Sequence, residues 1–386
     1  MIPYGRQNID DADVAAVVQV LQSDWLTQGP TLERFEQAMA AYCQAGHGVA
    51  VCNATAALHL ACLAAGLGEG DWLWTSPNTF LASANCGRYC GAQVDFVDID
   101  PRTLNLDAGK LAAKLALAEQ QGRLPKVVVA VAFAGQSCDL RAIAELARRY
   151  GFCLIEDAAH AVGARYAGRP TGCGEFAAMT VFSFHPVKII TTGEGGMVMT
   201  NSPELAARLK RLRSHGMTRD AVDMDEPSHG PWYYQQVELG FNYRMTDIQA
   251  ALGLSQLHKL DAFVARRRQL AARYDQLLGE LPLVLPAAQA DAESAWHLYV
   301  VRLNLPHIAL GHREVFEALR AAGIGVQLHY IPVHLQPYYR SLGFALGDFP
   351  EAERYYGEAI SLPLFAAMSD AEQDQVVATL QRIIRP

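Results

Sequence analysis

The chain has 386 residues, of which 51% are hydrophobic and 19% are charged, and its formal net charge at pH 7 is −8. This length and composition provide enough apolar material for a large core, in one large α/β unit or in two domains. The negative balance provides no basic field that would attract nucleic acid or acidic lipid, so we expect neither as a partner.

The opening residues and the cysteines bear on the compartment. Residues 1–6 lack the charged and apolar blocks of a secretory signal. The longest apolar run, around 127–134, is too short to cross a bilayer and suits a buried strand. The eight cysteines form no Cys-x-x-Cys pair, which indicates reduced packing residues. A cytoplasmic protein without a membrane partner is therefore expected.

In chain order, the predicted elements begin with an amphipathic helix at 10–23, capped by Asp10 or Asp11, and a turn rich in Gly and Pro at 25–30. Apolar strands then alternate with helices, which predicts a large, mostly parallel sheet with helices on both faces. The expected strands are 48–53, 72–76, 93–97, 126–133, 152–156, 177–184 and 196–200, and the expected helices are 55–66, 79–90, 107–119, 139–150 and one from 203.

The last third of the chain has a different pattern. Residues 218–236 have no apolar periodicity and predict a long loop, of a length that is usually functional or mobile. Residues 246–281 form one long helical pattern capped by Thr246 or Asp247. A smaller α+β domain is expected after it, with strands at 297–303 and 325–328 and helices at 313–322 and after Ser369. We therefore expect a large α/β domain at 1–245, and a connector helix with a small domain at 246–386.

Two apolar strands near the middle of the chain end in side chains suited to chemistry. One ends in Glu156 and Asp157, with His160 close behind, and the next ends in Ser183, followed by Lys188. Strand ends of open α/β sheets are where ligands bind. Apolar neighbours of Lys188 disfavour its ammonium form and favour a Schiff-base nucleophile. A carboxylate such as Asp157 can keep a pyridine nitrogen protonated, so the pair suggests pyridoxal 5'-phosphate (PLP).

Two other strand-to-helix turns carry candidate cofactor contacts. Residues 53–57 begin a helix whose first-turn N–H groups suit an anion, and Thr55 adds a hydroxyl. Phe80 lies at the next such turn, where its ring would stack on a flat cofactor. Each of the four residues has a structural explanation when it is taken singly. Thr55 could be a helix cap, Phe80 a core residue, Lys188 a surface lysine with its amine in water, and Asp157 a turn cap. Their combination favours the site.

As a set, these motifs resemble the PLP-dependent sugar-nucleotide aminotransferases of the DegT/StrS type, which have the fold type I aminotransferase architecture. The resemblance covers nearly the whole chain and keeps the order of the motifs. They are 53–58 (Asn-Ala-Thr-Ala-Ala-Leu), 156–160 (Glu-Asp-Ala-Ala-His), 183–188 (Ser-Phe-His-Pro-Val-Lys), 193–196 (Gly-Glu-Gly-Gly) and 240–247 (Gly-Phe-Asn-Tyr-Arg-Met-Thr-Asp).

The resemblance implies a role for each cofactor residue. Lys188 looks like the Schiff-base lysine and proton shuttle, and Asp157 like the partner of the pyridine nitrogen. His160 would lie near the ring hydroxyl, and Phe80 would stack on the ring. Shared sites in a homodimer are implied, because the phosphate would be bound from both subunits, by Thr55, Ala56 and Ser183 of one and Asn242 of the other.

Within the family, residues 25–30 and 329–334 look most like the transaminases of pseudaminic acid biosynthesis. These aminate C4 of a UDP-linked 4-keto-6-deoxy-N-acetyl-hexose to give UDP-4-amino-4,6-dideoxy-N-acetyl-β-L-altrosamine. L-Glutamate would be the donor and 2-oxoglutarate the product, with the cofactor cycling through pyridoxamine phosphate. The candidate substrate residues are Arg6, Thr27, Gln28, Glu194, Arg219, Arg244, His329, Tyr330 and His334.

Several alternative functions are compared with the transamination hypothesis. The enzyme could aminate C3 or C4 of another nucleotide-linked keto-deoxysugar. Some relatives are dehydratases with His in place of the lysine, but Lys188 is intact. A non-catalytic PLP- or sugar-nucleotide-binding regulator is disfavoured because no DNA-binding module is visible, and a dehydrogenase because no Gly-x-Gly-x-x-Gly follows the first strand. No metal site is expected, because Pro332 between His329 and His334 breaks helical spacing.

Overall fold

The computed structural model describes residues 1–385, and its centre is a seven-stranded sheet in the order β1-β9-β8-β5-β4-β2-β3. Strand β9 runs antiparallel to β1 and to β8, and every other neighbouring pair is parallel. The predicted mostly parallel sheet is therefore confirmed. Its strands are β1 (His47–Val51), β2 (Trp72–Thr75), β3 (Gln93–Phe96), β4 (Val127–Val131), β5 (Cys153–Asp157), β8 (Met179–Ser183) and β9 (Gly196–Thr200).

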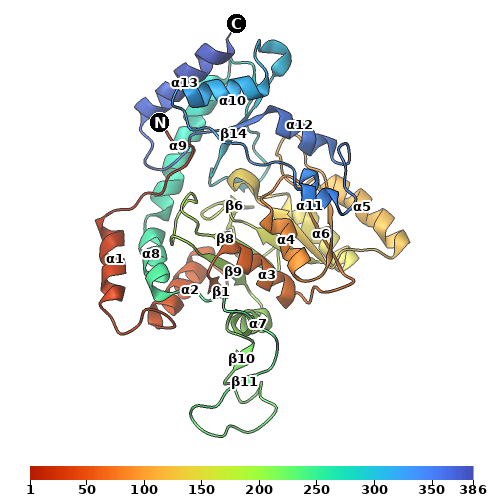
Figure 1. The fold of residues 1–386 in the computed structure, drawn as a ribbon, viewed down its shortest axis with the longest axis vertical. Coiled ribbons are helices and arrows are strands. Elements are labelled where there is room, and N and C mark those ends of the chain that lie inside the picture. Colours follow the sequence, from red (N-terminus) through yellow and green to blue (C-terminus); the bar gives the residue numbers. More distant parts are fainter. Residues whose placement is uncertain (386) are drawn as a thin grey trace.

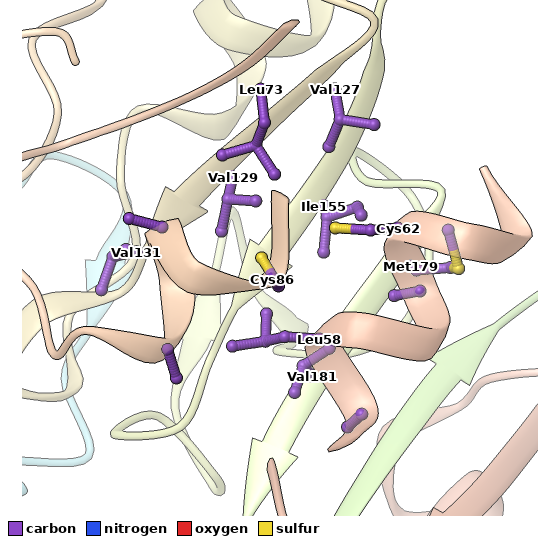
Figure 2. Close-up of a cluster of buried hydrophobic side chains, with 14 of the residues drawn as sticks. Leu58, Cys62, Leu73, Cys86, Val127, Val129, Val131, Ile155, Met179 and Val181 are labelled. Atoms are coloured by element: carbon purple, nitrogen blue, oxygen red, sulfur yellow. The ribbon is translucent and has the colours of Figure 1, made fainter. Parts of the chain in front are cut away.

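Helices cover both faces of this sheet because successive side chains of a strand point to opposite faces. Val129 of β4 lies in a buried cluster with Leu58 of α3 (Figure 2). Its neighbour Val128 lies in another cluster, with Leu111 of α5 and Ile143 of α6. The helices are α3 (Ala54–Ala64), α4 (Ala82–Tyr89) and α7 (Pro203–Arg213) in the first cluster, and α5 (Ala108–Gln121) and α6 (Leu140–Tyr150) in the second.

Helix α2 (Pro30–Cys43) is absent from the predicted elements, and its N-terminus is capped from a distant part of the chain. Gly29 is the N-cap residue and has no side chain that could accept a hydrogen bond. Instead, the buried carboxylate of Asp247 accepts from the N–H groups of Gly29, Thr31 and Leu32 at 2.8, 2.9 and 3.3 Å. The start of α2 therefore depends on a residue 216 positions away from Thr31.

The single long helix predicted at 246–281 is wrong, because the structure divides it into α8 (Asp247–Leu257) and α9 (Leu260–Leu278). Thr246 is the N-cap of α8. At the break, Lys259 Nζ donates to Oδ2 of the buried Asp13 at 2.5 Å. Asp13 belongs to α1 (Asp11–Leu21), which lies beside α8 (Figure 1). The Lys259 ammonium at the break thus neutralises the buried Asp13 carboxylate between α1 and α8.

The C-terminal part of the chain packs on a three-stranded antiparallel sheet, β12-β14-β15. The hydrophobic core on this sheet takes side chains from α9, from helices α10 and α13, and from Ile2 at the opposite end of the chain. The N-terminal residues therefore stabilise the C-terminal part. The elements are β12 (Leu283–Val284), β14 (Tyr299–Leu303), β15 (Ala359–Leu362), α10 (His312–Ala321), α12 (Pro350–Glu358) and α13 (Asp370–Ile384).

The strand expected at 325–328 is wrong, since that segment forms only an isolated bridge between Gln327 and Ser361. The division of the chain into a domain at 1–245 and a domain at 246–386 stays a prediction. Other short elements include β6 (Arg165–Tyr166), β7 (Arg169–Pro170), β13 (Ala292–Glu293) and α11 (Pro337–Arg340).

The long loop predicted at 218–236 is an arm that projects from the body of the protein, with a short hairpin at its base (Figure 1). The hairpin pairs β10 (Met217–Thr218) with β11 (Gln235–Gln236). Trp232 and Leu239 in this region are exposed. Within residues 1–385, no helix has the length and apolarity needed to span a membrane.

Replacing Asp247 with Ala is expected to lower the free energy of unfolding by about 3 kcal/mol, because three N–H groups at the start of α2 lose a charged acceptor. Asp247→Asn, which keeps one acceptor oxygen, should cost less. The measurement is urea denaturation followed by circular dichroism. As a control, Asp374→Ala removes an exposed ion pair with Arg273 and should cost less than about 1 kcal/mol. Equal losses in the Asp247 and Asp374 variants would contradict the capping role.

Candidate active site

A cleft of about 660 Å³ opens at the carboxyl ends of β5 and β8. The sheet contributes Asp157 and Ser183, the C-terminal part contributes His329 and Tyr330, and the N-terminal segment contributes Tyr4. Carboxyl ends of strands are where open α/β sheets place their ligands, because the connecting loops splay apart there. The fold therefore brings three distant parts of the chain together around one cleft.

Lys188 lies in the wall of this cleft, with the Asp157 carboxylate in the same lining. Burial lowers the pKa of the Lys188 ammonium to about 8, although the charge of Asp157 acts in the opposite direction. A lysine with this pKa is partly neutral near neutral pH, and the neutral amine is the nucleophilic form. The Lys188 amine is therefore chemically suited to Schiff-base formation.

The Asp157 carboxylate is 5% exposed and is held by two donors. Ser83 Oγ donates to its Oδ2 at 2.6 Å, and the Ala159 N–H donates to its Oδ1 at 3.1 Å. Burial raises the pKa of Asp157, whereas these two hydrogen bonds and the Lys188 charge lower it. The donors thus offset part of the cost of a buried carboxylate.

The imidazole of His160 is buried, and its two nitrogens have different partners. The Ala134 N–H donates to Nδ1 at 3.3 Å, and Nε2 lies 3.1 Å from the Tyr330 hydroxyl oxygen. Burial lowers the pKa of His160 well below its usual value, and the positive charge of Lys188 adds to this effect. In the neutral ring, Nδ1 accepts and Nε2–H donates to Tyr330. The hydroxyl hydrogen of Tyr330 therefore stays free to donate to a ligand.

The start of α3 presents backbone N–H groups suited to an anion in the cleft wall. Ala54 and Thr55 line the cleft, and their N–H groups precede the first intrahelical hydrogen bond. Gly196 at the start of β9 permits a close approach, since a Cβ there would lie 2.6 Å from the carbonyl carbon of Asn53. The predicted contact through Ala56 is not found, because Ala56 is buried and its N–H donates to Asn53 Oδ1 at 2.8 Å.

The cleft also offers a flat apolar surface. Phe80 is 57% exposed and lines the cleft, with its ring centroid 6.0 Å from that of Tyr330. An exposed ring in a cleft suits stacking on a planar cofactor. Together with the hydroxyls of Thr55 and Ser183, the amine and the carboxylate, this lining fits PLP. The donor set therefore matches a phosphate, a protonated ring nitrogen and a reactive aldehyde.

The structure divides the predicted substrate residues into two groups. Glu194, His329 and Tyr330 line the cleft. His334 does not: it is fully buried, and its Nε2 lies 2.8 Å from Glu353 Oε1, so its predicted substrate contact is corrected to a core contact. The others are absent from the cleft lining of this chain: Arg6, Thr27, Gln28, Arg219 and Arg244, together with the predicted cofactor residue Asn242.

Several cleft residues are not among the sequence-based candidates. Tyr4, His185, His297 and Gln327 line the cleft, and the ring centroids of His297 and His160 are 4.4 Å apart. His297 is the first residue of the strand predicted at 297–303 and carries no local motif, so only its place in the fold identifies it. Among the described residues, no group of His, Cys, Asp or Glu side chains could hold a metal ion.

The comparisons agree with this geometry. Residues 7–381 match the model of the DegT/DnrJ/EryC1/StrS aminotransferase family. The spore coat polysaccharide biosynthesis protein SpsC of Bacillus subtilis (strain 168) is 41% identical over 387 residues, which cover 100% of this chain and 97% of that protein. Helicobacter pylori PseC, an aminotransferase involved in the biosynthesis of pseudoaminic acid, is 30% identical with a TM-score of 0.89, and the match covers 99% of both chains.

A third similar protein is Spr1654 from Streptococcus pneumoniae, solved in a PMP-form and in a PLP-form. The PMP-form is 30% identical to this chain with a TM-score of 0.89 and covers 99% of both chains. The PLP-form is 29% identical with a TM-score of 0.87 and covers 99% of this chain and 98% of that chain. This chain therefore belongs to the DegT/DnrJ/EryC1/StrS aminotransferase family and is a PLP-dependent aminotransferase.

Proposed function

We propose that the protein transfers the amino group of L-glutamate to C4 of a UDP-linked 4-keto-6-deoxy-N-acetyl-hexose and releases 2-oxoglutarate. The observation that carries the proposal is the cleft itself, where the Lys188 amine and the Asp157 carboxylate share one lining with the anion-binding start of α3. These are the groups that PLP chemistry requires of a protein.

When bound, PLP supplies an electron sink that stabilises negative charge at the α-carbon of the donor amino acid. Lys188 Nζ, with its pKa lowered to about 8, is a base that removes the proton from that carbon. Asp157 would keep the ring nitrogen protonated, and Phe80 would pack against the face of the ring. His160 orients Tyr330, whose hydroxyl would be available to the ring hydroxyl of the cofactor.

The proposed substrate rests on similarity at two levels. The PseC match covers 99% of this chain, and residues 25–30 and 329–334 resemble the corresponding segments of pseudaminic acid transaminases. His329 and Tyr330 of the second segment line the cleft, where rings and imidazoles would pack against a sugar. The alternative is amination at C3 or C4 of another nucleotide-linked keto-deoxysugar, and the 41% identity to SpsC, a spore coat polysaccharide biosynthesis protein, is compatible with it.

A homodimer with shared sites completes the proposal. Within the described chain, the cleft lining contains Lys188 but no arginine, although a diphosphate and a donor carboxylate call for cationic partners. Arg219 is exposed on the projecting arm, and the exposed Asn242 lies at its base. Exposed Trp232 on the same arm would be buried by a second subunit. We therefore place the arm of one subunit over the cleft of the other.

Incubation with L-glutamate and a panel of nucleotide-linked keto-sugars tests the substrate. We expect 2-oxoglutarate release with the UDP-linked 4-keto-6-deoxy-N-acetyl-hexose, and mass spectrometry should show the 4-amino sugar. Lys188→Ala should lose activity by at least about a thousandfold, since it removes nucleophile and base together. Turnover only with a 3-keto sugar or with another nucleotide would favour the alternative. An active Lys188→Ala protein would contradict the assignment.

Mixed dimers test the shared site. Lys188→Ala inactivates the cleft of its own subunit, and Asn242→Asp is expected to repel the cofactor phosphate in the partner's cleft. Each variant alone should be inactive. After mixing and subunit exchange, one cleft of each heterodimer is intact, so about one quarter of the wild-type activity should return. The reference mixture combines Lys188→Ala with a second variant of the same subunit's cleft, Asp157→Ala, and should stay inactive, because each cleft of that heterodimer carries one of the two substitutions. A mixture of the Lys188→Ala and Asn242→Asp proteins that also stays inactive would exclude Asn242 as a contact from the partner.

A further inference from the structure

The hydroxyl groups behind Asp157 form a buried chain that the proposed function does not use. Ser83 on α4 is fully buried, and its Oγ donates to Asp157 Oδ2 at 2.6 Å. Thr79 Oγ1 lies 2.8 Å from the same Ser83 oxygen, and Thr79 is 2% exposed. Because the hydrogen of Ser83 points to the carboxylate, Thr79 must be the donor in the second contact. The chain of donors therefore runs from Thr79 to Ser83 to Asp157.

We propose that Ser83, supported by Thr79, is a positioning residue that keeps Asp157 ionised and aimed at the ring nitrogen of the cofactor. A carboxylate can hold a pyridine nitrogen in its protonated form only while it carries a negative charge. Ser83 binds one carboxylate oxygen and the Ala159 N–H binds the other, so the plane of the carboxylate is fixed on both sides. This inference rests on the assignment of Asp157 in the proposed function.

The neighbouring Glu156 provides an internal comparison, because its carboxylate is also buried and also contacts two hydroxyls. Its bonds from Ser137 and Thr180 are longer, at 3.2 and 3.3 Å. Burial raises the pKa of Glu156 to about 7, and the nearby charge of Asp157 adds to this effect. A buried carboxylate with longer hydroxyl contacts is thus partly protonated near neutral pH. Asp157 differs from Glu156 in its short bond from Ser83, in the N–H donor of Ala159 and in the nearby charge of Lys188.

Other charged and titratable groups also act on Asp157. Lys188, in the loop after β8, lowers its pKa. Tyr330 from the C-terminal part and Glu156 on the same strand each have a pKa raised by its negative charge. None of these groups donates a hydrogen bond to Asp157 Oδ2 in the structure, whereas Ser83 does. Removal of the Ser83 hydroxyl should therefore act first on Asp157, and on these neighbours only through the charge of Asp157.

The test is the nitrogen-15 NMR shift of PLP labelled at its ring nitrogen and bound to the full-length protein, recorded across pH. Removing the Ser83 hydroxyl should raise the pKa of Asp157, so a smaller fraction of Asp157 is ionised at a given pH. The midpoint, which is the pH at which half of the ring nitrogen is protonated, should therefore be lower. In Ser83→Ala we expect this midpoint to fall by about one pH unit, and kcat/KM to fall about tenfold. Ser83→Thr, which keeps the hydroxyl, should restore both.

Further variants separate the possible outcomes. Thr79→Val keeps shape and should move the midpoint in the same direction by less, which preserves the test if Ser83→Ala folds poorly. Thr180→Val removes a hydroxyl from Glu156 and should leave the midpoint unchanged. If the midpoint is unchanged in Ser83→Ala and Thr79→Val but changes strongly in Asp157→Asn, the proposed role of Ser83 is wrong and the assignment of Asp157 stands. An unchanged midpoint in Asp157→Asn as well would overturn the assignment of Asp157.

Discussion

The buried carboxylate of Asp157 is the constraint on which the cleft depends. A buried charge is costly unless it is paired and hydrogen-bonded. Here β5 delivers the carboxylate to the edge of the sheet, α4 supplies Ser83, and the loop after β8 supplies Lys188. The same low-polarity surroundings that raise the pKa of Asp157 lower that of Lys188. One desolvated environment thus favours the neutral amine of Lys188 and opposes the charge of Asp157, which the hydrogen bonds from Ser83 and Ala159 support.

The fold around this pair could be predicted where the signal was local. Apolar strands such as β4 bury both faces, so their continuous runs stand out in the sequence. Helix α2 was missed because its cap, Asp247, comes from another part of the chain. The break between α8 and α9 was also missed, since Lys259 is placed there by its contact with Asp13 in α1. Long-range contacts decided both cases.

The candidate site shows the same contrast between local signals, which the sequence reveals, and long-range contacts, which it does not. Lys188, Asp157 and Phe80 sit in motifs at strand ends, so their convergence could be predicted from topology. Substrate residues were harder to predict, because a histidine in an aromatic segment can face a cleft or a core. His329 lines the cleft, whereas His334, five positions later, pairs with Glu353 in the interior. Ser83 had no motif, and its role follows only from its distance to Asp157.

The measurement that tests the central claim most directly is the visible absorption spectrum of the purified protein with PLP, before and after addition of L-glutamate. We predict a visible band from cofactor bound to Lys188, and its loss on addition of glutamate with release of one equivalent of 2-oxoglutarate per site. The Lys188→Ala protein should lack the initial band. A wild-type protein that stays colourless with PLP, or a band that glutamate leaves unchanged, would contradict the account.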